Sequence, residues 1–136
     1  FVRDIEKDGL KDYAAAHGIG IITFSPLAQG LLTDRYLHGI PADSRVRTDG
    51  RFLKESALTE EKLAQIRALN EIAAARGQSL AEMALAWILK DGQVTSVLIG
   101  ASRPEQILDN IKALDNTTFT AEELEAIDKA SGYSKE

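Results

Sequence analysis

Two short polar segments that contain glycine follow apolar runs, and their residue types are those that bind phosphate groups. The first segment spans residues 25–30 (Ser-Pro-Leu-Ala-Gln-Gly) and follows the apolar run 19–24. Its small residues and single hydroxyl would let backbone N–H groups approach an anion closely. A Ser-Pro pair after a strand is also common in ordinary turns, so this segment alone is compatible with a purely structural role.

The second segment begins at Gly100, after the apolar run 95–99. Gly100 permits a tight turn. Ser102 is expected to cap the next helix and to face its amino terminus, where the helix dipole and free N–H groups favour a phosphate. Arg103 adds a planar fork of donors suited to a phosphate monoester. Gly-Ala-Ser before Pro-Glu is also compatible with a plain helix start.

The helix that follows the second segment carries two amide side chains, Gln106 and Asn110, four residues apart. Residues at this spacing share one face of a helix, and their amides can hydrogen-bond a purine and a ribose. The combination of this face with both phosphate-type segments indicates a nucleotide site, which neither segment indicates by itself.

The remaining candidate side chains favour structural roles. Tyr13 is expected to pack on a helix face, Tyr36 to anchor the first polar segment, and Tyr133 to lie in a polar tail. His17 and His38 are not placed as a pair of metal ligands, and the chain has no cysteine. We therefore expect no metal site and no catalytic acid or base among these residues.

Hydrophobic periodicity predicts the elements that position the two segments. Thr59 is expected to cap one helix, and Ser79 and Thr120 begin capping-box sequences. Trp87 lies on an apolar helix face and is assigned to the core. Helices are expected at residues 4–17, 60–76, 79–90, from 104 onward and at 120–130, with strands near 19–24 and 95–100 and a long loop at 34–58.

Strands that alternate with helices imply a parallel α/β fold. Both expected strands are apolar on both faces, as in buried parallel sheets, and two such strands cannot cover each other. A closed (β/α)₈ barrel takes ~250 residues, whereas this chain has 136 and begins without methionine. We expect the missing strands to come from absent chain, another molecule or a swapped dimer, and the chain alone to form a dimer or larger assembly.

Composition places the chain among ordinary globular proteins. Its formal net charge is −5, which argues against a general nucleic-acid or membrane-surface role. No apolar run approaches the ~20 residues that span a bilayer, and no signal-peptide pattern opens the chain. These features, with the absence of cysteine, favour a reducing, cytoplasmic setting.

Five separated blocks of sequence resemble the aldo-keto reductase family, in particular the branch of the potassium-channel β-subunits and bacterial L-glyceraldehyde 3-phosphate reductases. The resemblance implies the C-terminal portion of a (β/α)₈ TIM barrel, its last two βα units, that binds NADP(H) without a Rossmann fold. Strand seven would lie near 19–24 and strand eight near 95–100, with the loop 34–58 over the cofactor. The five blocks are residues 24–30, 39–41, 44–45, 84–87 and 96–102.

Carried onto this sequence, the resemblance implies three groups of cofactor contacts. The loop after strand seven would hold the pyrophosphate through Ser25, Pro26, Leu27, Ala28 and Gly30. The long loop would contribute Arg35 and Arg45. The 2′-phosphate and adenine would be held by Gly100, Ser102, Gln106, Asp109 and Asn110, with Arg103 as a further 2′-phosphate ligand that favours NADPH over NADH.

Two positions depart from the channel β-subunits. Asp43 stands where those proteins have a tyrosine, and Asp109 replaces a glutamate and keeps its charge. The family's catalytic Asp, Tyr, Lys and His, and the strands that orient the nicotinamide, are expected outside this chain.

Three functions remain open. The parent protein would reduce small aldehydes and ketones, or act as a cofactor-sensing binding subunit. The isolated chain would be an inactive structural fragment.

Overall fold

The computed structural model describes residues 3–38 and 58–133. Most of the expected cofactor-covering loop, with Arg45 and Asp43, therefore lies outside the described residues. The part of this loop that is described begins with a short 3₁₀ helix, η3 (Asp34–Tyr36).

The two expected strands are present and pair in parallel, but they are shorter than their apolar runs. Strand β1 (Ile22–Phe24) lies beside β2 (Ser96–Leu98), with Thr23 opposite Val97. The regular ladder does not extend back to residue 19. At Ile21 the backbone carbonyl still accepts from the Thr95 N–H at 2.9 Å, while the Ile21 N–H donates to the Thr95 side-chain oxygen at 3.1 Å. A side-chain oxygen thus takes the place of one backbone acceptor at the point where the two runs meet.

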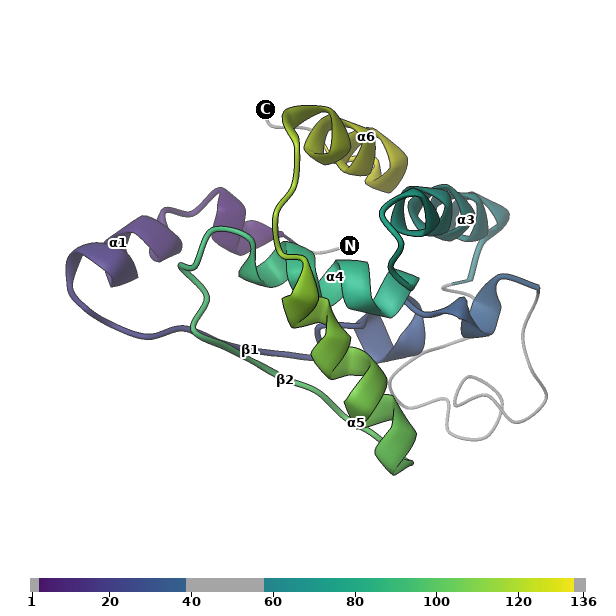
Figure 1. The fold of residues 1–136 in the computed structure, drawn as a ribbon. Coiled ribbons are helices and arrows are strands. Elements are labelled where there is room, and N and C mark those ends of the chain that lie inside the picture. Colours follow the sequence, from purple (N-terminus) through teal and green to yellow (C-terminus); the bar gives the residue numbers. More distant parts are fainter. Residues whose placement is uncertain (1–2, 39–57, 134–136) are drawn as a thin grey trace.

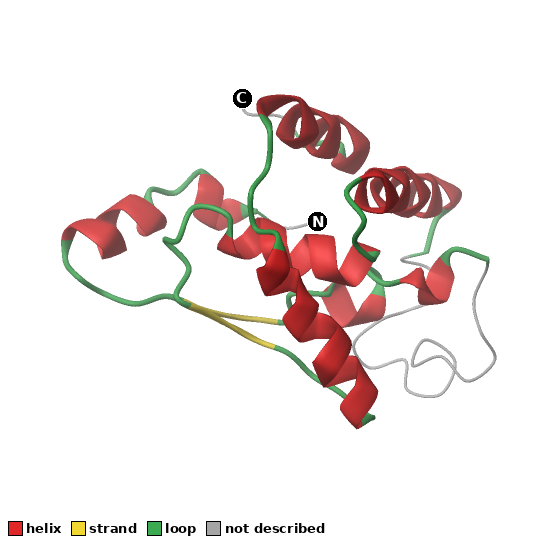
Figure 2. Ribbon diagram, in the orientation of Figure 1, coloured by secondary structure: helices red, strands yellow, loops and turns green. Residues whose placement is uncertain are grey.

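Only one face of this strand pair is covered in the described chain. Thr23 and Val97 are half-buried, and Val97 packs against a cluster formed by Leu85, Ala86 and Ala113. On the opposite face, Phe24 is 80% exposed and Ile22 is 63% exposed. Figure 2 shows the helices on one side of the strands. The prediction that two strands cannot bury each other is therefore confirmed.

The expected helix at 4–17 is wrong as a single element. The structure has a 3₁₀ helix, η1 (Asp4–Glu6), and then α1 (Leu10–Ala16). Gly9 separates them with φ of 76°, a left-handed conformation that an α-helix does not contain. Tyr13, which was expected to pack on the helix, is 59% exposed and stacks on His17 with 4.1 Å between ring centroids.

The three helices predicted with capping residues form as expected. They are α3 (Glu60–Ala75), α4 (Leu80–Leu89) and α6 (Ala121–Ser131). Thr59 accepts a hydrogen bond from the Lys62 N–H at 3.1 Å, and full capping boxes begin at Ser79 and Thr120. Such caps satisfy backbone N–H groups that have no partner inside the helix.

The main core lies between α3, α4 and α6 (Figure 1). Ile66 and Ala73 of α3 are fully buried, with Leu80 of α4 and Ile127 of α6 beside them. The remaining helix, α5 (Pro104–Ile111), continues into the 3₁₀ helix η5 (Lys112–Asp115). Large apolar side chains of both elements are exposed in the described chain. They are Ile107, Leu108 and Ile111 of α5 and Leu114 of η5.

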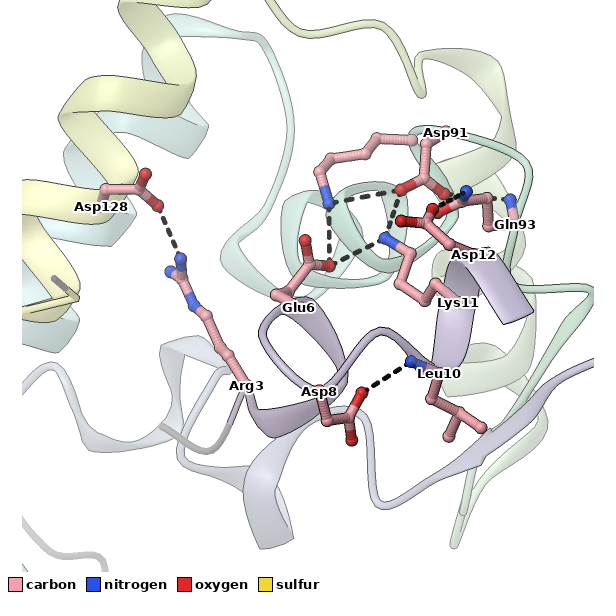
Figure 3. A network of polar contacts seen from close by, with 10 residues as sticks. Arg3, Glu6, Asp8, Leu10, Lys11, Asp12, Asp91, Gln93 and Asp128 are labelled. Atoms are coloured by element: carbon pink, nitrogen blue, oxygen red, sulfur yellow. Dashed lines mark hydrogen bonds and ion pairs between the residues drawn. The ribbon is translucent and has the colours of Figure 1, made fainter. Parts of the chain in front are cut away.

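A polar network ties η1 and α1 to the turn after α4 (Figure 3). Lys11 is buried and donates hydrogen bonds to Glu6 at 2.9 Å and to Asp91. Burial alone would raise the pKa of Asp91, but the hydrogen bonds from Lys11 and from the Gln93 N–H hold it below its ordinary value of 3.8. Burial alone would lower the pKa of Lys11, but Asp91 and Glu6 hold it above 10.5.

These opposite shifts predict how Asp91→Asn changes stability with pH. A carboxyl with a lowered folded-state pKa stabilises the fold above its unfolded pKa and loses that contribution as pH falls through the folded value. We expect Asp91→Asn to cost about 1–2 kcal/mol at pH 7, because the lost bond is charged but partly exposed. The difference from the parent chain should shrink below pH 3.8. Urea denaturation at pH 7 and pH 2.5 measures both values.

The matched control is Asp12→Asn, because Asp12 accepts a hydrogen bond from the uncharged amide of Gln93 at 3.1 Å. This control should change stability by less than about 0.5 kcal/mol at either pH. Equal effects of the two substitutions, or an Asp91→Asn effect that does not depend on pH, would contradict the assignment.

Candidate functional site

The loop after β1 has a strained backbone at the predicted phosphate-binding segment. Ser25, Ala28 and Gln29 have φ values of 51°, 48° and 61°, and they are the non-glycine residues with positive φ in the described part of the chain. Each such residue costs roughly 1 kcal/mol or more, and such strain gathers at functional sites. This strain agrees with the prediction that the segment binds a ligand, which stays a prediction.

Hydrogen bonds and a buried tyrosine hold this loop in place. The Ala28 N–H donates to the Ser25 carbonyl at 3.0 Å, and the Gly30 N–H donates to the Leu27 carbonyl at 2.9 Å. Behind the loop, Tyr36 is 1% exposed and belongs to the main core. This position agrees with the prediction that Tyr36 anchors the loop, which stays a prediction. A fixed loop lets backbone groups keep one geometry toward a ligand.

Three donors converge on one oxygen at the start of α5. Gln106 Oε1 accepts hydrogen bonds from the Ser102 N–H at 2.8 Å, from the Ser102 hydroxyl at 3.1 Å and from the Arg103 N–H at 3.3 Å. The expectation that Ser102 caps the helix is corrected by this arrangement, because Gln106 supplies the oxygen and the hydroxyl acts as a donor. Donors of this kind are those that bind a phosphate oxygen at a helix amino terminus.

The other predicted residues near α5 have different surroundings. Asp109 accepts a hydrogen bond from Lys112 at 2.8 Å, and this bond raises the pKa of the Lys112 ammonium. Asn110 is half-buried, and Gly100 and Arg103 are exposed. In the other loop Arg35 is exposed at η3, while Pro26 and Leu27 are half-buried.

The two loops lie at the same end of the sheet. Because β1 and β2 are parallel and Phe24 pairs with Leu98, the residues that follow each strand leave the sheet side by side. Figure 1 shows β1 leading to the loop before η3 and β2 leading to the start of α5. The carboxyl ends of parallel strands are where α/β barrels place their ligands.

Phe24 is a candidate site residue that the sequence analysis did not select. It is the last residue of β1, directly before the strained loop, and its ring is 80% exposed. Leu98 beside it is 58% exposed, so an apolar surface adjoins the phosphate-type loop. An aromatic residue at the end of an apolar strand and next to Ser25 was the available signal. A planar ring can stack on such a surface.

The described residues also include the tyrosines and histidines that were considered for metal binding or acid–base chemistry. They contain no group of three or more His, Asp or Glu side chains that could hold a metal ion. Tyr133 lies beneath the guanidinium of Arg3, and Tyr36 is buried in the core. Within the same residues, no helix is both long and apolar enough to cross a membrane.

A parallel strand pair with helical connections, and with phosphate-type loops at the carboxyl ends, is typical of (β/α)₈ barrel proteins. The sequence model of the aldo/keto reductase family matches residues 1–131, and the chain belongs to that family.

Two curated relatives carry different functional names. L-glyceraldehyde 3-phosphate reductase of Escherichia coli (strain K12) is 55% identical over 130 residues, which cover 93% of this chain and 38% of that protein. A probable voltage-gated potassium channel subunit beta of Oryza sativa subsp. japonica is 41% identical over 113 residues, which cover 82% of this chain and 34% of that protein.

Solved structures agree on the fold. The glycerol dehydrogenase of Gluconobacter oxydans gives a TM-score of 0.73 at 31% identity. The match covers 96% of this chain and 39% of the dehydrogenase. A thermostable aldo-keto reductase gives a TM-score of 0.62 at 25% identity, and the match covers 95% of this chain and 36% of that protein. The chain thus corresponds to part of a (β/α)₈ barrel and spans 38% of the length of the E. coli reductase.

Proposed function

We propose that this chain forms the dinucleotide-phosphate clamp of an NADP(H)-dependent oxidoreductase that reduces small aldehydes and ketones to alcohols. The single observation that carries the proposal is the convergence of the Ser102 and Arg103 donors on one oxygen at the start of α5. In the bound state a phosphate oxygen would take the place of Gln106 Oε1. Arg103 would then add a charged, forked contact to the 2′-phosphate.

The strained loop after β1 would hold the pyrophosphate. Its left-handed residues, Ser25 and Ala28, are fixed from behind by the core, so the loop needs little reordering when a ligand binds. Gly30, with φ of 93°, completes the turn. The bound cofactor supplies hydride chemistry, while these residues only bind and orient it.

The nicotinamide ring is proposed to stack on Phe24. This departs from the expectation that the ring-orienting strands lie outside the chain, because Phe24 presents an exposed ring directly beside the pyrophosphate loop. A ring over Phe24 and Leu98 would also be shielded from water on one face.

The rest of a barrel is the proposed partner of the two free strand edges and of the exposed apolar face of α5. An exposed, apolar strand edge associates readily with other chains. The isolated chain is therefore proposed to associate into a dimer or larger assembly and to lack turnover. Catalytic groups would come from the remainder of the barrel.

The reductase function is favoured over a channel-modulating function by the relatives. The E. coli protein named a reductase is 55% identical, and the rice protein named a channel subunit is 41% identical. A small phosphorylated aldehyde is a reasonable first substrate to test, given the name of the E. coli relative.

The test uses a chimeric barrel, in which this chain replaces the matching segment of the E. coli reductase. The chimeric barrel should bind NADPH and reduce small aldehydes, whereas the chain alone should show no turnover. A chimeric barrel that folds but does not bind NADPH would refute the proposed clamp.

Phe24→Ala in the chimeric barrel should weaken NADPH binding by roughly 10- to 100-fold, because stacking of a base on an aromatic ring contributes about 1–3 kcal/mol. Fluorescence titration with NADPH measures the change. Phe24→Tyr keeps the ring and serves as the control, with affinity within about threefold of the parent. An unchanged affinity for Phe24→Ala would remove Phe24 from the site.

A further inference from the structure

A second candidate site lies among the helices, on different elements from the two loops. A cavity of about 510 Å³ opens between η1, α4 and α6. Binding pockets for small molecules commonly have volumes of ~300–1,000 Å³. The side chains that matter for its chemistry are Arg3, Lys7, Trp87, Lys90, Leu124 and Tyr133.

The lining is positively charged in a chain whose net charge is −5. Three cations, Arg3, Lys7 and Lys90, share the wall with two carboxylates, Glu6 and Asp128. Arg3 is tightly paired, because it donates to Asp128 at 2.6 Å (Figure 3) and to the Ser131 hydroxyl. An excess of positive charge in a cavity favours an anionic ligand.

Lys90 shares both of its carboxylate partners with Lys11. Its ammonium lies 3.4 Å from Glu6 and 4.0 Å from Asp91, and both carboxylates also bind Lys11. Its side chain is 16% exposed. Burial lowers the pKa of Lys90, and the nearby carboxylates do not restore it to the ordinary value. An additional anion beside this ammonium would therefore be stabilised.

Two aromatic rings and one aliphatic side chain provide a surface for an apolar group. The Trp87 ring has Lys90 at 3.7 Å and Arg3 at 4.5 Å from its centroid, and the Tyr133 ring has Arg3 at 4.5 Å. Leu124 of α6 completes this part of the wall. The cavity thus combines under-compensated positive charge with apolar surface.

We propose that this cavity binds a small organic anion that has an aromatic or apolar body, such as an aryl carboxylate. The carboxylate would lie against Lys90, and the body would contact Trp87, Leu124 and Tyr133. Because the cavity residues lie on the helices and the nucleotide loops follow the strands, this site is separate from the proposed cofactor clamp.

The sequence contains one tryptophan, Trp87, and it lines the cavity, so its fluorescence can report on a ligand bound there. Benzoate is the probe. It should change Trp87 emission saturably with a dissociation constant in the low millimolar range, which is typical of a ligand of its size. Acetate, which lacks the ring, and benzyl alcohol, which lacks the charge, should each bind at least tenfold more weakly. Equal responses to all three compounds, or no response to benzoate, would overturn the proposal.

Lys90→Gln should weaken benzoate binding at least fivefold, with retained helicity checked by circular dichroism. Lys112→Gln is the matched control, because Lys112 is an exposed lysine paired with Asp109 and does not line the cavity. Should Lys90→Gln fail to fold, Lys7→Gln removes another lining charge from an exposed position and should weaken binding at least twofold. The proposed site would be overturned if the folded variant, Lys90→Gln or Lys7→Gln, bound benzoate as tightly as Lys112→Gln does.

Discussion

Truncation of Tyr36 to alanine should lower the free energy of unfolding by about 3–5 kcal/mol, the range for loss of a buried aromatic side chain. Tyr36 is 1% exposed and packs in the main core with Leu31, Leu63 and Ile66. The surrounding helices cannot close the resulting cavity fully, because α3, α4 and α6 are held by their own contacts. Urea denaturation of the chain, followed by circular dichroism, measures the change.

Tyr13→Ala is the matched control, since it removes the same atoms from a side chain that is 59% exposed. Only the stacking on His17 is lost, and the cost should stay below about 1 kcal/mol. The same truncation of Tyr36 should also loosen the loop at residues 25–30, because the tyrosine packs directly behind Gly30. Similar costs for the two variants would contradict the assignment of Tyr36 to the main core.

The sequence predicted best those helices whose start signals are local. Thr59, Ser79 and Thr120 each supply an oxygen for nearby N–H groups, and α3, α4 and α6 begin at the next residue. Their apolar faces also became core, with Ile66 and Leu80 fully buried. Local capping and helical periodicity therefore agree with tertiary packing in these elements.

Features that depend on distant contacts were harder to predict. The helix expected at 4–17 contains Gly9, whose left-handed conformation breaks it and lets Lys11 donate to both Glu6 and Asp91. The apolar run at 19–24 predicted a longer strand, but the Thr95 side chain takes the place of a ladder bond at its start. Neither effect follows from the periodicity of one segment.

The sequence predicted where the two loops of the candidate site lie, but not the directions of their side chains. Both loops follow their strands at one end of the sheet, as expected from parallel pairing. The direction of the Gln106 side chain, which turns back to the helix start, depends on a rotamer that the sequence does not specify. Phe24 was missed because a strand that is apolar on both faces predicts burial of its side chains, whereas this one is exposed.

Arg103→Leu in the chimeric barrel should abolish most of the preference for NADPH over NADH. Arg103 is exposed at the start of α5, where its own N–H and the groups of Ser102 already point at one acceptor oxygen. A phosphate bound there would gain a charge-assisted hydrogen bond from the guanidinium, worth about 1.5–3 kcal/mol or roughly 10- to 100-fold in affinity. NADH has no 2′-phosphate, so its affinity should change by less than about twofold.

The variant tests the 2′-phosphate assignment because the two nucleotides differ only in that group. Arg67→Leu removes an exposed arginine from α3, outside both nucleotide loops, and should leave both affinities unchanged. An equal loss for NADPH and NADH in Arg103→Leu would place Arg103 at the pyrophosphate or in the support of the loop. A loss confined to NADPH that grows at low salt would identify the guanidinium as a charged 2′-phosphate ligand, because salt screens exposed charge pairs.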